Sequence, residues 1–527
     1  MKPFTAPLLE GSLQGPALLG VAIAGCSAGF LLFGYDQGIA NALTQSPDFA
    51  KEFPTLMDKN NSTLLGATLS FFVLGAFFGA MFNTWIGNKI GRRPLLYIGT
   101  TGTLVGAALQ AGSVKLGMFM FTRLLNGFAV GILTASVPPY VAELTKPRWR
   151  GLLMSIELVL AATGLMSAFW VAYAFRKETG PLGWRMPLAI QAFLVLISLF
   201  CLMFSPESPR YLVEVGRMED ARAVLRRLYG SEYADQAIRE IQEAVELEES
   251  VAVRKWSDIF QNNKQCFRYR TMCAVGVNFF QQATGINIAT YYAGTIFIEG
   301  VGLNPDTASL VLGNLGVVGL VFAIAGCFYF VDNLGRVRTM MLGAFLQCIG
   351  MILLAAGITT TDENGVVTKS ASYAAAVGMF LFLAAFSGFW LVPSWIYGAE
   401  ITPLAIRQRS QSLGIATQYL FNFVLTSELS PTYLNPISMV TPTAIASIKG
   451  YYYIVWIITN AAIVVLLWYF FPEPARLSLE QVDMLFLDGK VTVRRSPNAP
   501  LKVGGMPTAP SPTGEKDKEG SSHHELA

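Results

Sequence analysis

Two charged residues stand inside long apolar segments, where a charged side chain is costly. Asp36 lies late in the first such segment and Arg123 lies early in the fourth. A carboxylate and a guanidinium in these places predict either a proton-titrating pair or a structural ion pair between two helices. Gly127 and Gly131 follow on the helix face of Arg123, which predicts that another helix backbone approaches closely there.

Three side-chain amides interrupt a later apolar segment. Gln281, Gln282 and Asn287 carry both donors and acceptors, which suits a solute rich in hydroxyl groups. Regular helical spacing does not bring them onto one face, so Thr284-Gly285 is predicted to loosen the helix until they converge. Tyr291 shares a face with Asn287. The alternative interpretation is that the amides form hydrogen bonds between helices.

Further candidate ligands occur towards the C-terminus. Trp395 offers a flat apolar ring of the kind that packs on the C–H face of a sugar, although a Trp in a membrane helix is also common as packing or at the interface. Gln418 and Asn422 are four residues apart and share one helix face.

The composition indicates which solvent surrounds these residues. Of 527 residues 53% are hydrophobic and only 14% are charged, against about 25% in soluble domains. Much of the chain therefore faces lipid. The net charge of +3 does not indicate a nucleic-acid partner. The two histidines, His523 and His524, lie at the end of the chain, and the six cysteines form no CxxC pair. We therefore expect no enzyme, no metal site and no cofactor.

Twelve apolar runs approach the roughly 20 residues that a membrane crossing needs. The sequence thus predicts an all-α integral membrane protein of twelve transmembrane helices. The runs are 16–43, 63–87, 94–114, 116–138, 152–175, 186–205, 271–298, 307–331, 338–358, 372–398, 410–427 and 451–471.

Basic residues follow every second run, which predicts that these loops and both termini face the cytoplasm. Residues 1–15 lack the zones of a signal peptide, so the first run is expected to serve as its own targeting signal. Asn60 and Asn61 begin overlapping glycosylation sequons in a loop that this topology places outside.

An internal repeat organises the chain. Gly91-Arg92-Arg93 recurs as Gly335-Arg336-Val337-Arg338, the Glu143–Arg150 spacing recurs as Glu400–Arg407, and Pro206-Glu207 recurs as Pro472-Glu473. Three motif pairs in the same order predict two related six-helix halves around a central site. The expected parts are an N-terminal tail (1–15), an N-terminal half (16–205), a helical cytoplasmic linker (206–269), a C-terminal half (270–472) and a cytoplasmic tail (473–527) that is disordered from about 487.

With these motifs the chain resembles the sugar porter family of the major facilitator superfamily over residues 16–486, and the run Phe33–Gly38 looks like fungal-type members. The matching motifs are Gly91-Arg92-Arg93, Arg123 with Gly127 and Gly131, Pro138-Pro139-Tyr140 with Glu143 and Arg150-Gly151, Pro206-Glu207-Ser208-Pro209-Arg210, Gln281-Gln282-Ala283-Thr284-Gly285-Ile286-Asn287, Asp332 with Gly335-Arg336, and Glu400 with Arg407.

The resemblance implies a monomeric plasma-membrane transporter that moves a hexose or pentose by alternating access. It makes Asp36 the proton acceptor of a sugar/proton symporter, with Arg123 as its partner. Facilitated diffusion, polyol/proton symport, disaccharide transport and a non-transporting nutrient sensor stay open, and a sensor is expected to need a longer cytoplasmic tail. The implied sugar ligands are Gln281, Gln282, Asn287, Tyr291, Trp395, Gln418, Asn422 and Glu157.

Charged residues at the cytoplasmic helix ends are interpreted as gate latches that cross-pair between the halves while the inner side is closed. They are Arg92, Glu143, Arg150, Asp332, Arg336, Glu400 and Arg407.

Several positions depart from the family pattern. Glu157 stands at or next to a position that commonly holds a sugar-binding Gln, where a carboxylate either binds hydroxyls or titrates. Leu320 and Leu391 replace an Asn and a Gly, and segment 428–450 exceeds the usual last outer loop in length. These departures leave the sugar open.

Overall fold

The computed structural model describes residues 13–493 except 45, 58–61, 179, 252–254, 361–366, 427–448, 476, 478, 490 and 492. The sequons at Asn60 and Asn61 and nearly all of segment 428–450 therefore lie outside the described residues. The N-terminal half is built from α1 (Gly15–Thr44), α4 (Ser62–Ile90), α5 (Arg92–Ala111), α6 (Leu116–Leu144), α7 (Pro147–Phe175) and α8 (Leu182–Leu202), with the short α2 (Pro47–Glu52) and α3 (Pro54–Met57) between the first two.

The C-terminal half also crosses six times, and four of its crossings are composed of consecutive segments. They are α12 (Phe267–Ala283) with α13 (Ile286–Tyr291), α14 (Ala293–Thr295) and η3 (Ile296–Gly300); α15 (Pro305–Ala325) with η4 (Gly326–Phe330) and α16 (Val331–Leu334); α17 (Arg336–Thr359); α18 (Lys369–Phe389) with α19 (Leu391–Ile401); α20 (Arg407–Thr426); and η5 (Lys449–Tyr452) with α22 (Tyr453–Phe470). The predicted twelve crossings are confirmed.

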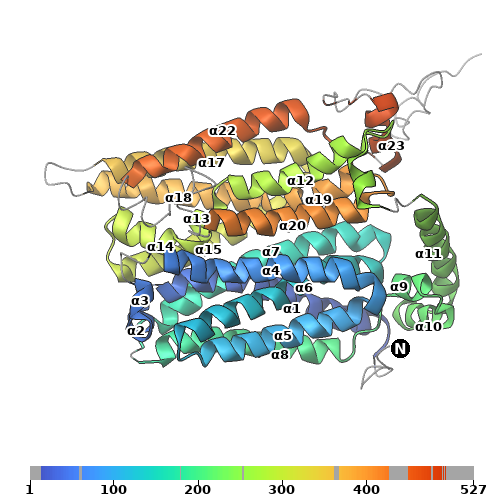
Figure 1. Cartoon of the computed structure of the whole chain (residues 1–527), viewed down its shortest axis with the longest axis horizontal. Helices are drawn as coiled ribbons and strands as arrows, with labels where there is room; N and C mark the ends of the chain where they lie inside the picture. Colours follow the sequence, from blue (N-terminus) through green and yellow to red (C-terminus); the bar gives the residue numbers. More distant parts are fainter. Residues whose placement is uncertain are drawn as a thin grey trace, which may run out of the picture.

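The two halves lie side by side with their long helices roughly parallel to one axis (Figure 1). They meet along two seams, because α7 packs against α15 and α4 packs against α20. Small residues bring α4 and α6 together within the N-terminal half. A Cβ on Gly127 would lie 1.9 Å from the Phe72 carbonyl oxygen, and one on Gly131 would lie 2.2 Å from that of Ala76. The close approach predicted for this face is confirmed, with α4 as the neighbour.

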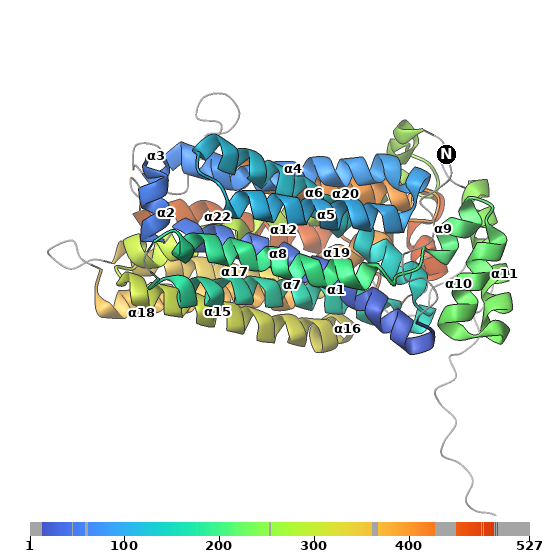
Figure 2. The same cartoon turned by 90° about the horizontal axis from the view of Figure 1, so that it is seen from below.

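The extramembrane elements gather at the two ends of the bundle. The helices α9 (Pro209–Glu214), α10 (Met218–Tyr229) and α11 (Ser231–Val251) cover one end, and α2 and α3 lie at the opposite end (Figures 1 and 2). We call the first the basic end, because Arg92, Arg336 and Arg407 begin helices there and Arg150 lies in the first turn of α7. The helices α9, α10 and α11 lie in segment 206–269, for which a helical linker is expected.

The residues after the last crossing also fold. The helix α23 (Leu479–Asp483) and η6 (Met484–Gly489) return to the basic end, where Arg270 Nη2 lies 2.5 Å from Asp483 Oδ1. Arg270 also lies over the Phe486 ring, 4.5 Å from its centre. The start of the expected tail is therefore docked onto the C-terminal half.

Two crossings are broken by their own sequence. Between α12 and α13, Gly285 adopts φ +91°, a conformation that side-chain-bearing residues rarely adopt. The Thr284 carbonyl accepts a hydrogen bond from Asn460 Nδ2 at 2.9 Å, so the backbone group is satisfied within the bundle. The predicted loosening at Thr284-Gly285 is thus confirmed. Between α18 and α19 the break falls at Trp390, because Pro393 has no N–H to donate to the carbonyl four residues earlier.

Candidate functional site between the two halves

A cavity of about 400 Å³ lies between the two halves. Arg92 and Arg407 contribute to its lining, so it reaches the basic end. Trp395 contributes the aromatic wall and is itself packed edge-to-face on Phe30, with ring centres 6.1 Å apart. Asn278 adds a polar wall that the sequence analysis did not single out. A small amphipathic solute fits a cavity with one aromatic and several polar walls.

The predicted amides of the broken crossing form a chain of hydrogen bonds. Gln281 Nε2 donates to Ser394 Oγ at 2.8 Å, Gln282 Nε2 donates to Gln281 Oε1 at 3.2 Å, and Asn287 Nδ2 donates to Gln282 Oε1 at 3.3 Å. The break at Gly285 therefore brings together amides that a continuous helix would separate. All three are buried and none lines the cavity. In this arrangement the three amides bond to one another. The bond from Gln281 to Ser394 of α19 is one between helices, of the kind that the alternative interpretation predicts.

Contacts between the halves close the opposite end. The Tyr291 hydroxyl of α13 bonds to Gln37 Oε1 of α1. Arg176 Nη1 lies 2.9 Å from Asp306 Oδ1, which joins the end of α7 to the start of α15. Deeper in the bundle the Thr134 and Tyr419 hydroxyls are 2.7 Å apart. The solute cavity is thus accessible from the basic end and closed at the other.

Asp36 and Arg123 lie close enough to interact electrostatically but are held by different partners. Asp36 Oδ1 accepts hydrogen bonds from Asn126 Nδ2 at 3.0 Å and from Gln191 Nε2 at 2.6 Å. Arg123 Nη2 donates to the Leu69 carbonyl at 3.4 Å, and its guanidinium lies over the Phe72 ring. Both side chains are fully buried. The predicted pair is therefore a charge interaction without a direct hydrogen bond among the described contacts.

Tyr291 connects this charge pair to the amides. Its hydroxyl interacts with Arg123 and Asp36 and also hydrogen-bonds the Asn422 side chain of α20. Gln418, one turn before Asn422, is buried, and its Oε1 has no hydrogen-bond partner among the described residues. A ligand hydroxyl is the kind of donor that such an amide oxygen accepts. The charge pair and the amide Asn422 therefore interact with one shared side chain.

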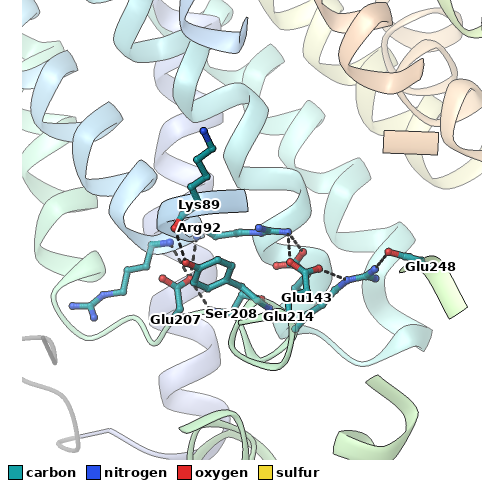
Figure 3. A network of polar contacts seen from close by, with 10 residues as sticks. Lys89, Arg92, Glu143, Glu207, Ser208, Glu214 and Glu248 are labelled. Carbon is teal, nitrogen blue, oxygen red and sulfur yellow. Dashed lines mark hydrogen bonds and ion pairs between the residues drawn. The ribbon is translucent and has the colours of Figure 1, made fainter. Parts of the chain in front are cut away.

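At the basic end of the N-terminal half, Glu207 caps α5. Its Oε1 accepts hydrogen bonds from the backbone N–H groups of Arg92 and Arg93, both at 3.1 Å, and of Ser208 at 2.9 Å (Figure 3). Burial raises the pKa of Glu207 above its usual range, although these donors and Arg92 act in the other direction. Arg92 Nη2 also pairs with Glu143 Oε1 at 3.1 Å (Figure 3).

The C-terminal half repeats this arrangement. Glu473 accepts backbone hydrogen bonds from Arg336 at 2.8 Å and from Val337 at 2.9 Å. Arg336 binds Glu400 through two nitrogens, each at 2.9 Å. Asp332 lies more loosely, at 3.8 Å from Arg336 Nη1. Gly91 and Gly335, which precede the capped helices, have nearly the same conformation, with φ of 96° and 92°.

Further equivalent contacts complete the two halves. Arg150 Nε and Arg407 Nε each donate to a carbonyl five residues earlier, at 3.3 Å, on Thr145 and Thr402. The ion pair between Arg92 and Glu143 lies within the N-terminal half, and the pair between Arg336 and Glu400 lies within the C-terminal half. Neither pair joins the two halves, and the cavity between them is accessible. Cross-pairing in the closed form of this end stays a prediction.

Glu157 is not in the cavity wall. It is 2% exposed on α7, and neither carboxylate oxygen has a hydrogen-bond partner among the described residues. The sequence analysis also missed Asn126, Gln191 and Ser394, which hold Asp36 and Gln281. Polar residues within apolar runs were the available signal, but many of those prove to be ordinary helix contacts.

Comparison with known proteins agrees with the repeat and the fold. Residues 21–486 match the family described as "Sugar (and other) transporter". The chain is 32% identical to the MFS-type transporter oryC of Aspergillus oryzae, over 90% of this chain and 86% of that one. It is 31% identical to the sugar transporter STL1 of Saccharomyces cerevisiae, over 87% of this chain and 79% of that one.

A solved structure of the proton:xylose symporter XylE bound to 6-bromo-6-deoxy-D-glucose superimposes with a TM-score of 0.72. It is 25% identical, and the match covers 89% of this chain and 99% of that one. The two six-helix halves, the family match and these relatives agree on what the molecule is. The chain is a multi-pass membrane protein of the major facilitator superfamily and belongs to its sugar porter family, whose members are transporters and not enzymes.

Proposed function

We propose that this protein transports a monosaccharide by alternating access and couples that transport to protons. The observation that carries the proposal is the placement of Tyr291, which interacts with Asp36 and Arg123 on one side and with Asn422 on the other. A proton taken up by Asp36 weakens its attraction for Arg123, and Tyr291 transmits that change to the solute region. The similarity to a proton:xylose symporter supports the same coupling.

In this proposal the basic end faces the cytoplasm of a cell whose plasma membrane holds the protein. Basic residues concentrate in cytoplasmic loops of membrane proteins, and both described ends of the chain lie at this end. The arrangement is then open to the cytoplasm and closed outside by Tyr291–Gln37 and Arg176–Asp306. Solute would enter from outside after these contacts separate and the basic end closes.

The sugar ligands of the proposal are the amides Gln281, Gln282, Asn287, Gln418 and Asn422, with Trp395 beneath them. The hydrogen bonds among Gln281, Gln282 and Asn287 would be exchanged for bonds to sugar hydroxyls when solute binds. Such exchange leaves none of these three amides without a hydrogen bond in either state, which is what a reversible site needs.

Uptake of radiolabelled sugars by a host without its own sugar transporters tests the transport proposal. Competition by hexoses, pentoses, disaccharides and polyols then identifies the solute class. Absence of uptake for every solute, despite protein at the cell surface, would contradict it. A nutrient sensor is the second candidate, because the chain is also 29% identical to the high glucose sensor RGT2 of Saccharomyces cerevisiae, although it covers only 61% of that longer protein.

Proton coupling is tested by Asp36→Asn. A single coupled proton contributes about 2.3 kcal/mol per 100 mV, which corresponds to roughly 50-fold accumulation. The variant is expected to lose accumulation and the effect of a protonophore while retaining exchange of labelled sugar across the membrane. Asp235→Asn, at an exposed ion pair with Arg222 in the linker helices, is the matched control and should keep accumulation. Accumulation by Asp36→Asn equal to wild type would disprove the role.

A further inference from the structure

Glu157 is a buried acid that neither the charge pair nor the amide chain explains. Its side chain is 2% exposed within α7, and neither oxygen has a hydrogen-bond partner among the described residues. An ionised carboxylate without partners in apolar surroundings is strongly disfavoured, so the side chain carries a proton in this arrangement.

The side chains around Glu157 provide no partner that would stabilise an ionised carboxylate. On α1, Cys26 lies near enough to interact electrostatically with Glu157, and it also interacts with Cys201 of α8 and with Tyr140 of α6. From the other half, Cys327 of η4 hydrogen-bonds Ser155, two residues before Glu157. Within the described part of the chain no basic side chain acts on the carboxyl group.

Its position along the bundle lies between the proton pair and the cavity. Met154, one turn earlier on the same face of α7, lines the cavity. Ala161, one turn later, meets α1 at Gly34, where an added Cβ would lie 1.8 Å from the Ala161 carbonyl oxygen. Since α1 and α7 run in the same direction, Glu157 lies about 9 Å nearer the basic end than Asp36, at 1.5 Å per residue.

We propose that Glu157 is a second proton-binding site of the transport cycle. It holds its proton while its surroundings exclude water, as here, and releases it when the halves move and water reaches it. The O–H bond then breaks, a water molecule accepts the proton, and the carboxylate remains hydrated. The residues that shield Glu157 from water are able to move away from it, because α7 packs on α15 and η4, which belong to the other half. This inference rests on the proposed alternating access and adds a titrating group to it.

The competing interpretations are a sugar ligand and a permanently neutral acid. Glu157 lies outside the cavity wall, so a direct bond to solute requires the same rearrangement and gains no support from the contacts seen here. A permanently neutral acid would behave as Gln does at this position. Glu157→Gln therefore separates a titrating group from a structural one, because Gln reproduces the neutral shape and lacks the exchangeable proton.

Transport is measured with wild type, Glu157→Gln and Glu157→Asp at matched surface amounts and over a range of external pH. If Glu157 must ionise in each cycle, Glu157→Gln loses at least tenfold in net uptake and its pH profile flattens, while sugar exchange stays within about twofold. Glu157→Asp keeps a titrating group and should recover a pH-dependent net uptake. Wild-type net uptake and pH profile in Glu157→Gln would overturn the proposal.

A second measurement needs no sugar. Infrared spectra of the purified proteins report the C=O stretch of a protonated carboxyl group. The band that depends on Glu157 should vanish in Glu157→Gln, remain in Asp36→Asn, and shift in Glu157→Asp. An unchanged band in Glu157→Gln would show that Glu157 is not protonated and would refute the proposal. If wild type transported no sugar, the band would still be readable, so failure of the proposed function and failure of this inference are distinguishable.

Discussion

Tyr291 joins groups that are far apart in the sequence. Its hydroxyl bonds to Gln37 of the first crossing and Asn422 of the eleventh, and it interacts with the charge of Arg123. One phenol oxygen therefore contributes to closure of the opposite end and also interacts with the charge pair of Asp36 and Arg123. This is a stronger role than the shared helix face with Asn287 could predict.

Tyr291→Phe removes only that oxygen. We expect the closed opposite end to lose about 0.5–1.5 kcal/mol, the usual net contribution of a hydrogen bond, and net uptake to slow accordingly. Tyr453→Phe is the matched control, because Tyr453 is fully buried and its hydroxyl has no hydrogen-bond partner among the described residues. Uptake rates and thermal unfolding check both variants, and equal effects would contradict the role of Tyr291.

The helices α5 and α17 begin in the same way, each with a half-buried carboxylate on its first backbone N–H groups. Glu207 and Glu473 perform this role in the two halves. A helix start leaves N–H groups unpaired, and these two acids satisfy them from a different segment of the chain. The sequence repeat thus corresponds to a repeat of individual hydrogen bonds.

Glu207→Ala and Glu473→Ala are each expected to cost about 1–3 kcal/mol, because partly buried N–H groups lose their acceptor. Glu207→Gln keeps an acceptor oxygen and removes the charge of a partly buried side chain, so it should recover most of that loss. Thermal unfolding of the purified variants provides the measurement. Equal melting temperatures for Glu207→Ala and Glu207→Gln would argue against the capping role.

The break between α12 and α13 depends on Gly285. Gly285→Ala forces a side chain into a conformation at φ +91° and places its Cβ 3.0 Å from Trp456. We expect a loss of about 1–3 kcal/mol in stability and weaker apparent affinity for solute, because the amide chain shifts. Gly117→Ala, where no atom lies within 4 Å of the added Cβ, should be nearly silent. Wild-type uptake by both variants would refute the link between the helix break at Gly285 and solute binding.

At the level of helices, the sequence predicted the crossings but not all of the contacts between them. The lengths of the apolar runs predicted the crossings, and the repeat predicted the two halves. The spacing of the amides around Thr284-Gly285 predicted the loosening at Gly285. The hydrogen bonds of Asp36 could not be predicted, because they depend on how α6 and α8 rotate to present Asn126 and Gln191. The docking of α23 through Arg270 was missed because a five-residue helix carries almost no periodic signal.

In the whole molecule, the contacts that close the cavity join the two halves at the end opposite the basic end. A repeated sequence would suit an arrangement open at either end equally, so it could not indicate that this one is accessible from the basic end. Trp395 and Asn278 line the cavity in this arrangement, while Gln281 and Asn287 do not. Membership of the family was predictable from the sequence, whereas the end at which the cavity is accessible was not.

The ion pair between Arg176 and Asp306 is one of the closing contacts. Asp306 is 72% exposed, so the pair contributes at most about 1 kcal/mol, or roughly fivefold in the balance of the two arrangements. Arg176→Asp should shift that balance towards opening outside, and the double variant Arg176→Asp with Asp306→Arg should restore it. A cysteine placed at Leu43 in the double and single variants reports the balance through its reaction with an impermeant thiol reagent. Reactivity that is the same in single and double variants would contradict the pairing.

Polar residues in three crossings have a consequence for how the chain is made. Nine helices in the described residues are apolar enough to span a membrane unaided, and the crossings that begin with α5, α12 and α20 are not among them. Each of these packs on other helices, α5 on α6 and α8, and α12 on α20. The helices α5 and α12 are synthesised before these partners, whereas α20 follows α12 and α4. We therefore expect damage to these seams to appear as degraded chains before it appears as slow transport.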